Sequence, residues 1–270
     1  MKFRRCWWAI LITVCVGVLT YNALVLINWL IDKNRLEQEI VELADDLKTI
    51  EIDGGEPVNP PDDTDSDYWD FVKLPLIDVD IAALKNRNAD TVGFLSVAGT
   101  NINYPVVQTS DNDYYLTHSF KKDSNRAGWI FMDYRSQASL SDRNTIIYGH
   151  GRIDGAMFGS LKNILDTAWV DNRDNQVIRY VTESETMLFQ VFAVYTVPSE
   201  SQYIQTVFSS DTEYQNWLDT MINRSQYNFH TTLNENDQIL TLSTCYGASS
   251  QDRVVMQAKL IKKTTVRLGH

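Results

Sequence analysis

The chain has 270 residues, of which 44% are hydrophobic, and it carries a formal net charge of −11 at pH 7. The charge is uneven, because residues 36–70 hold thirteen acidic side chains and a single basic one, Lys48, so the chain beyond residue 70 is close to neutral. That remainder is about 200 residues long, enough to bury the core of one domain. It has no basic stripe, which excludes the usual signature of a nucleic-acid-binding protein.

An uncharged, apolar segment occupies residues 6–31. It is longer than the roughly 20 residues that a helix needs to cross a hydrocarbon core about 30 Å thick, and tryptophans lie near both ends, where they favour the membrane interface. A cleaved signal peptide is the alternative, but its apolar region covers only about 7 to 15 residues. We therefore expect a single-pass membrane anchor. Basic side chains precede it, so residues 1–5 should stay in the cytoplasm and the rest of the chain should be extracellular.

Residues 32–67 are expected to form an acidic stalk. Apolar residues recur there at spacings of three and four, which predicts one face of a short helix: Leu36, Ile40, Leu43, Leu47 and Ile50. A stretch rich in Gly, Pro and acidic residues follows and is typical of a linker. It resembles a calcium loop only superficially, since Tyr68 and Leu74 stand where glycine and glutamate are required. One hypothesis is that this stalk holds the domain clear of an anionic surface.

From residue 68 the pattern changes to short β-rich runs separated by turn residues, which predicts a globular domain over 68–263 and a tail over 264–270. The predicted strands are TVGFLSV, INYPVVQ, GWIFMDY, NTIIYGH, QVIRYVT, MLFQVFAVYTV, QILTLSTC and RVVMQAKLI. Helical interruptions are expected around residues 78–86, 111–118, 156–164 and 211–224. Eight strands with few, irregularly placed helices indicate a mainly β fold, a barrel or a sandwich, and not a doubly wound sheet.

Cys245 ends the seventh of these runs and has no partner for a disulfide, because Cys6 and Cys15 belong to the apolar segment. A single cysteine outside the cell is a candidate reactive thiol or intermolecular bridge. The alternative is a small buried core residue, which is common for cysteine.

His150 is the best candidate for a base beside this thiol. It ends the run NTIIYGH as Cys245 ends ILTLSTC, and glycines flank it, whereas His118 and His230 lie among aromatic residues and His270 lies at the end of the sequence. A thiol needs such a group to become a nucleophile near neutral pH.

Arg253 begins the strand that follows Cys245, so a hairpin would bring it back beside the thiol. It cannot act as a base but can donate to a developing oxyanion. The alternative is a surface arginine paired with Asp252. We expect no cofactor and no metal, since the segment GHGRIDG has the wrong glycine spacing for a dinucleotide loop and no zinc or phosphate-binding motif occurs.

These motifs resemble the sortases, the membrane-anchored cysteine transpeptidases of Gram-positive bacteria. TLSTC matches the TLxTC signature of that family, YGH matches its histidine segment, and an arginine follows on the next strand; the resemblance spans residues 68–263. The segments DNDYYLTHSF, GWIFMDYR and DTEYQNWLDTMINR are similar to class B sortases in particular. Class C enzymes are disfavoured by the lack of a DP-aromatic lid motif.

The resemblance implies an eight-stranded β-barrel and a set of residue roles. Cys245 would attack the threonine carbonyl of a C-terminal sorting signal on a secreted surface protein, and a peptidoglycan-precursor amine would resolve the thioester. His150 would handle protons, and Arg253 would stabilise the oxyanion with the backbone N–H of Tyr246. Ser243 and Thr244 would shape the pocket. The loop after Cys245 departs from the family pattern, with small residues at 247–250 in place of bulkier acidic ones.

Two other functions fit the residues alone. A surface cysteine protease or amidase of papain-like type would hydrolyse its substrate without regard to added amine. A membrane-anchored, non-catalytic binding module would keep Cys245 only as a core residue.

Overall fold

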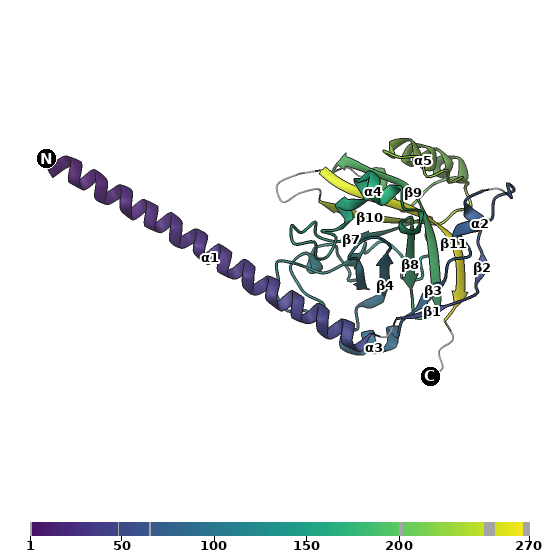
Figure 1. Cartoon of the computed structure of the whole chain (residues 1–270), viewed down its shortest axis with the longest axis horizontal. Coiled ribbons are helices and arrows are strands. Elements are labelled where there is room, and N and C mark those ends of the chain that lie inside the picture. The colour runs from purple at the N-terminus through teal and green to yellow at the C-terminus, as the bar shows by residue number, and fades with distance from the viewer. Residues whose placement is uncertain (1, 48, 65, 200–201, 246–251, 267–270) are drawn as a thin grey trace.

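The computed structural model describes residues 2–47, 49–64, 66–199, 202–245 and 252–266. A single long helix, α1 (Lys2–Asp46), extends from a β-rich body that contains the rest of the described chain (Figure 1). Within α1 lies a candidate membrane span, a solvent-exposed stretch long and apolar enough to cross a bilayer. The expected span and the expected stalk helix are thus parts of one continuous helix.

The stalk differs from the prediction at its end. Leu36 and Leu43 are 0% and 3% exposed and pack on the body, as the apolar spacing requires. The helix ends at Asp46, however, and Ile50 lies in a short strand, β1 (Ile50–Ile52), paired with β3 (Leu76–Asp78). Another short strand, β2 (Glu56–Pro57), lies within the segment expected to be a linker and pairs with the C-terminal strand.

A closed barrel of eight strands forms the body, and each predicted β-rich run overlaps one of them. The strands are β4 (Thr91–Val97), β5 (Asn103–Val107), β6 (Phe131–Met132), β7 (Asn144–Tyr148), β8 (Val177–Val181), β9 (Glu185–Pro198), β10 (Ile239–Cys245) and β11 (Asp252–Thr265). Their order is β10-β7-β6-β5-β4-β8-β9-β11, and pairing of β10 with β11 closes the ring. The predicted mainly β barrel is confirmed.

The barrel has an apolar interior and one helix-covered outer face. Alternate positions of β10 and β11, such as Leu240, Leu242 and Met256, belong to the interior cluster. The opposite face of β9, β10 and β11 packs against α5 (Asp211–Arg224), whose buried residues Tyr214, Trp217, Leu218 and Met221 share one side of that helix. The hydroxyl of Ser210 caps α5 by accepting from the N–H of Glu213 at 3.1 Å.

The remaining elements are short. They are α2 (Tyr68–Phe71), α3 (Ile81–Arg87), α4 (Thr167–Val170) and the 3₁₀ turns η1 (Tyr114–Leu116), η2 (Leu161–Leu165), η3 (Arg173–Asn175) and η4 (Gln202–Ile204). Helical structure therefore occurs in or overlaps all four segments where it was expected. Of these elements, η1 and η4 bear directly on the candidate site.

Candidate active site

Three neighbouring strands bring the predicted residues to one end of the barrel. β10 pairs in parallel with β7, and their last register pair is Ser243 with Tyr148. Cys245 and His150 each lie two residues beyond that pair, and the backbone of Cys245 is paired with Arg253 on β11. Position 150, which is far from 245 and 253 in the sequence, therefore meets them at the same edge. The side chain of Cys245, and Tyr246 with the loop after it, lie outside the described part of the structure.

Hydrogen bonds fix both the ring and the backbone of His150. Its Nε2 lies 2.8 Å from the carbonyl oxygen of Leu116, in η1. Because a carbonyl can only accept, Nε2 carries a hydrogen in this contact, and in neutral imidazole the lone pair is left on Nδ1. The His150 carbonyl accepts from the N–H groups of Arg152 and Phe158, each at 3.1 Å, which fixes the backbone that follows β7.

Two glycines make room for this histidine. Gly128 has φ +61°, and a Cβ there would lie 2.8 Å from Cδ2 of His150 and 2.5 Å from the carbonyl oxygen of Tyr115. A Cβ on Gly149 would lie 2.5 Å from Cδ1 of Ile130. Both positions require glycine, one for its backbone conformation and both for space. Gly149 was noted in the sequence because it is next to His150, but nothing in the sequence marked Gly128 as part of the site.

A cavity of about 260 Å³ opens at this edge. Its lining comes from six parts of the chain and comprises Asn112, Leu116, Phe131, Tyr148, Gly149, His150, Ser199, Tyr203, Ile204, Ser243, Thr244 and Arg253. Thus His150, Ser243, Thr244 and Arg253, all predicted from sequence, share one cavity. Arg253 is half-buried there, and its Nη1 lies 3.4 Å from the main-chain oxygen of Asp252. His118 instead stacks on Tyr114, with ring centroids 4.0 Å apart, and is not in the lining.

The two hydroxyls of β10 in this lining differ in their partners. Ser243 shares a hydrogen bond of 3.0 Å with the hydroxyl of Tyr203, which ties η4 to the strand. Thr244 is 3% exposed, and its Oγ1 has no hydrogen-bond partner among the described residues. Buried polar groups are nearly always bonded, so this hydroxyl, on a residue that lines the cavity, is a candidate partner for a bound ligand.

A buried carboxylate, missed by the sequence analysis, supports two side chains of the cavity lining. Asp133 is fully buried and accepts hydrogen bonds from the Tyr148 hydroxyl at 2.9 Å and the Asn112 side-chain amide at 3.2 Å. It also forms a bidentate salt bridge with Arg135, through two hydrogen bonds of 2.9 and 2.7 Å. Burial raises the pKa of Asp133, but the hydrogen bonds from Arg135 and Tyr148 outweigh it, so the pKa lies below its ordinary value. Burial and the Asp133 charge raise the pKa of Tyr148. The ionised Asp133 thus fixes two lining side chains, Tyr148 and Asn112.

Comparison with known proteins agrees with this geometry. The sortase domain family model matches residues 95–261. A sortase B of Listeria monocytogenes is 37% identical over 182 residues, covering 67% of this chain and 73% of the relative. The solved structure of a Bacillus anthracis protein similar to sortase B is 45% identical, with a TM-score of 0.62, over 67% of this chain and 82% of that one.

A solved sortase B–substrate complex from Staphylococcus aureus is 35% identical, with a TM-score of 0.63, over 67% of this chain and 84% of that chain. Such complexes agree with binding of peptide substrates by this domain. Sequence family, barrel topology and the edge formed by β7, β10 and β11 lead to one conclusion: the chain belongs to the sortase family, as a class B cysteine transpeptidase.

Proposed function

We propose that Cys245 is the nucleophile of this transpeptidase, that His150 transfers protons and that Arg253 stabilises the oxyanion. The thiolate sulfur of Cys245 attacks the threonine carbonyl carbon of a sorting signal, and the C–N bond breaks. His150 protonates the leaving amine, and a thioester remains on Cys245. An incoming amine then attacks the thioester carbon, His150 accepts its proton, and the thiolate leaves.

The observation that supports these roles is the backbone register. Cys245 is paired with Arg253, and it lies as far beyond the Ser243–Tyr148 pair as His150 does. A guanidinium that starts the strand beside the nucleophile is suited to an oxyanion, because it donates in a fixed plane and is always charged. The backbone N–H of Tyr246 would be the second donor, and Ser243 and Thr244 would contact the bound peptide.

The partners follow from the family and its relatives. The acyl donors would be secreted surface proteins with a C-terminal sorting signal, and the acceptor a peptidoglycan-precursor amine. A relative of this chain has been solved as a sortase B complexed with triglycine, which makes that peptide a suitable acceptor for a first assay. The α1 helix would hold the enzyme in the cell membrane, with its N-terminus inside and the domain at 68–263 outside.

A transpeptidation assay tests this function. Peptides with LPxTG-type and NPxTN-type signals are incubated with the solubilised full chain, with and without triglycine or a diaminopimelate amine, and products are identified by mass spectrometry. We expect an amide product that depends on the amine and slow hydrolysis without it. Hydrolysis at a rate that added amine does not alter would favour the papain-like alternative.

A matched pair of histidine variants tests the assigned roles in the same assay. His150→Asn should lower kcat by about 10²- to 10⁴-fold, the usual contribution of general acid–base catalysis. His230→Asn is the control, because His230 is exposed, lies outside the cavity lining and has φ +51°, a conformation that Asn tolerates. Equal activities of the two variants would overturn the role of His150.

A further inference from the structure

The α1 helix contacts the domain immediately after its apolar segment ends. That segment runs to Ile31, and the side-chain amide of Asn125 donates to the main-chain oxygen of the next residue, Asp32, at 3.2 Å. In the same part of the helix, Lys33 Nζ lies 5.8 Å from the ring centroid of Trp29. No free spacer therefore separates the apolar part of α1 from the domain, in contrast to the hypothesis of a stalk that holds the domain away.

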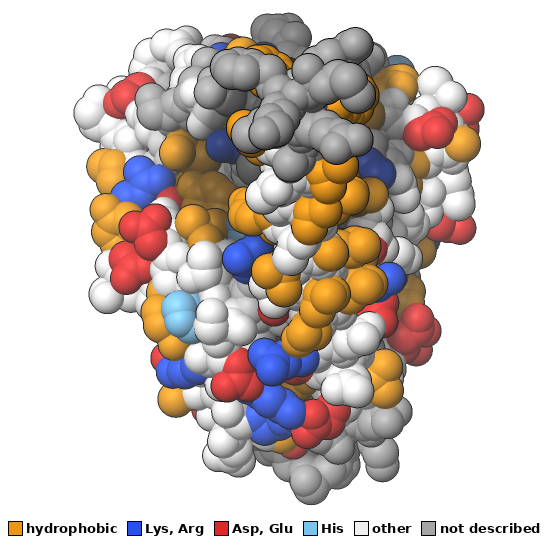
Figure 2. Space-filling view, turned by 90° about the vertical axis from the view of Figure 1, so that its left-hand side faces the viewer, with side chains coloured by type: hydrophobic (Ala, Val, Ile, Leu, Met, Phe, Trp, Pro, Cys, Tyr) orange, Lys and Arg blue, Asp and Glu red, His pale blue; other side chains and the backbone are white. Residues whose placement is uncertain are grey.

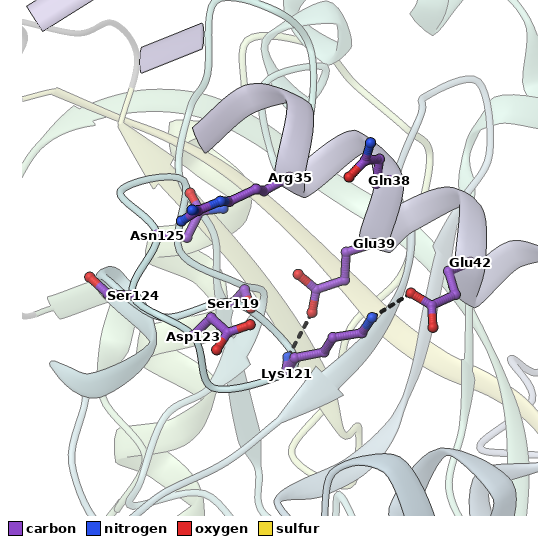
Figure 3. A pocket seen from close by; sticks show the side chains of 9 residues that line it. All are labelled: Arg35, Gln38, Glu39, Glu42, Ser119, Lys121, Asp123, Ser124 and Asn125. Carbon is purple, nitrogen blue, oxygen red and sulfur yellow. Dashed lines mark hydrogen bonds and ion pairs between the residues drawn. The ribbon is translucent and has the colours of Figure 1, made fainter. Parts of the chain in front are cut away.

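The following turns of α1 are fixed to the domain by a polar cluster (Figure 3). Glu39, which is 6% exposed, accepts from the backbone N–H of Lys121 at 2.6 Å, and Glu42 pairs with the Lys121 ammonium and, at 3.1 Å, with Arg87. Together with buried Leu36 and Leu43, these contacts lock the orientation of the helix. Since α1 is continuous, the direction of its apolar part is locked relative to the barrel as well.

The catalytic edge of the barrel is turned toward the apolar part of α1. β7 and β10 lie on the side of the body toward which α1 extends (Figure 1). In the view onto that side α1 extends toward the viewer, and the band of hydrophobic side chains down the centre belongs to this helix, with basic and acidic side chains near the lower end of the band (Figure 2). A bilayer spanned by the apolar part of α1 would therefore face the edge that holds His150.

The loop of residues 151–155, directly after His150, presents an apolar side chain at this place. Ile153 is 81% exposed, whereas its neighbours Arg152 and Asp154 are turned inward, with side chains 10% and 11% exposed and paired at 2.5 Å. A bridge between Gly151 and Met157 closes the loop. The ion pair between its neighbours and the closing bridge thus leave Ile153 as the exposed apolar tip of this loop.

The loop lies within the electrostatic reach of Lys33, one residue beyond the point where α1 first meets the domain. Burial raises the pKa of Asp154, but the hydrogen bond and charge of Arg152, the N–H of Ala156 and the charge of Lys33 together lower it below its ordinary value. Contacts of the intervening segment agree with this placement: Asn125 donates to the main-chain oxygen of Asp32, and, three residues further on, a Cβ on Gly128 would lie 2.8 Å from Cδ2 of His150, next to the loop.

We propose that the Ile153 tip is seated in the interfacial layer of the same lipid bilayer that α1 spans, so that the His150 edge works against the membrane surface. Apolar side chains favour that layer, and the tip is pre-positioned because both the loop and the helix are fixed to the barrel. The proposal rests on α1 as a membrane span and is independent of the roles assigned to Cys245 and Arg253.

Photocrosslinking of the full chain in vesicles of phosphatidylcholine and phosphatidylglycerol tests this contact. The photoreactive amino acid p-benzoylphenylalanine replaces Ile153 in one sample and Val207 in another, and lipid adducts are measured by mass spectrometry. Val207 is the matched control, since it is 80% exposed but adjoins Gln205, which is bonded to Asn144 at the far end of β7. We expect at least tenfold more lipid adduct at 153 than at 207.

A third sample, with the same probe at Leu19, tests the membrane span of α1 separately from the lipid contact of Ile153. Leu19 is 69% exposed within the candidate span and must give lipid adducts if α1 crosses the bilayer. Adducts at 19 with equal, low yields at 153 and 207 would overturn the proposed contact alone. No adducts at 19 would overturn the membrane span and, with it, the contact. Hydrolysis of a soluble peptide by the Ile153 sample verifies that it is folded.

Discussion

Cys245 and Arg253 are direct register partners on antiparallel strands that close the barrel. This pairing places the backbone of a permanent cation opposite the backbone of the proposed nucleophile, and it depends on strand register more than on the conformation of the loop between them. A nucleophile at position 245 would thus have a cationic donor on the neighbouring strand.

Replacing Arg253 should impair catalysis with little effect on folding. Arg253→Ala should lower kcat/KM by about 10²- to 10³-fold, the usual cost of losing an oxyanion donor. Arg253→Lys should recover only part of this, because an ammonium lacks the planar set of donors. Arg173→Ala is the control, since Arg173 is a surface residue paired with Asp67 at 2.9 Å. Activity of Arg253→Ala within threefold of the unaltered protein would contradict the role.

Comparing Gly128→Ala with Gly155→Ala should distinguish the effect of backbone strain from the effect of displacing the His150 ring. The new Cβ would crowd the His150 ring, so we expect kcat to fall at least tenfold and stability to fall by about 1–3 kcal/mol from the positive φ and the close contacts. Gly155→Ala is the control, because Gly155 has φ +80° but its nearest neighbour would lie 3.6 Å away. It should lose stability yet keep kcat. Peptide turnover and urea unfolding measure both effects, and equal kcat values for the two variants would refute the explanation.

Asp133→Asn should weaken the pocket wall and change the pH dependence of stability. The folded-state pKa of Asp133 is lowered, so its ionised form adds stability that is present above the ordinary pKa of 3.8 and is lost as the pH falls through the folded value. We expect a loss of about 2–3 kcal/mol at pH 7, as for hydrogen bonds to a buried charge. The difference from the unaltered protein should shrink between about pH 5 and pH 3.

Urea unfolding across that pH range measures the Asp133 effect. Asp171→Asn, at an exposed position, serves as the control and should change stability by less than about 0.5 kcal/mol throughout. A difference for Asp133→Asn that stays constant with pH would show that its charge is not what supports Tyr148 and Asn112.

Two threonines of β10 should respond in opposite ways to the same substitution. Thr244→Val removes a buried hydroxyl without a partner among the described residues, so stability should stay constant or rise slightly, while KM for peptide rises about threefold to tenfold as a ligand hydrogen bond is lost. Thr241→Val breaks bonds of 2.6 Å to Asn144 and 3.1 Å to Gln257, and should cost about 1–3 kcal/mol. Equal stability losses in the two variants would contradict this assignment.

The sequence predicted the strands and supplied candidates for the reacting residues because both leave local signals. Short β-rich runs marked all eight strands, and the segments TLSTC and YGH pointed to Cys245 and His150. Asp133, Gly128 and the Tyr203–Ser243 bond were missed, because each depends on contacts between segments that the fold alone brings together. No period or motif in one sequence encodes such contacts.

The extent of the α1 helix was also predicted only in part from the sequence. Its apolar spacing predicted the buried positions Leu36 and Leu43, but also included Ile50, which pairs in β1. An isoleucine at the right spacing fits a helix or a strand equally well, and only the pairing with Asp78 decides between them. The docking of Glu39 and Glu42 on Lys121 is a contact between distant segments, so the sequence showed only an acidic stretch.

The central claim is a covalent acyl intermediate on Cys245, and intact-mass analysis tests it most directly. The full chain is incubated with a sorting-signal peptide without an acceptor amine, quenched in acid and measured beside Cys245→Ala. We predict a mass increase equal to the acyl fragment, assigned to Cys245 by peptide mapping, lost on addition of triglycine and absent in the variant. Turnover of the peptide by Cys245→Ala at the rate of the unaltered protein, or an adduct on another residue, would contradict the account.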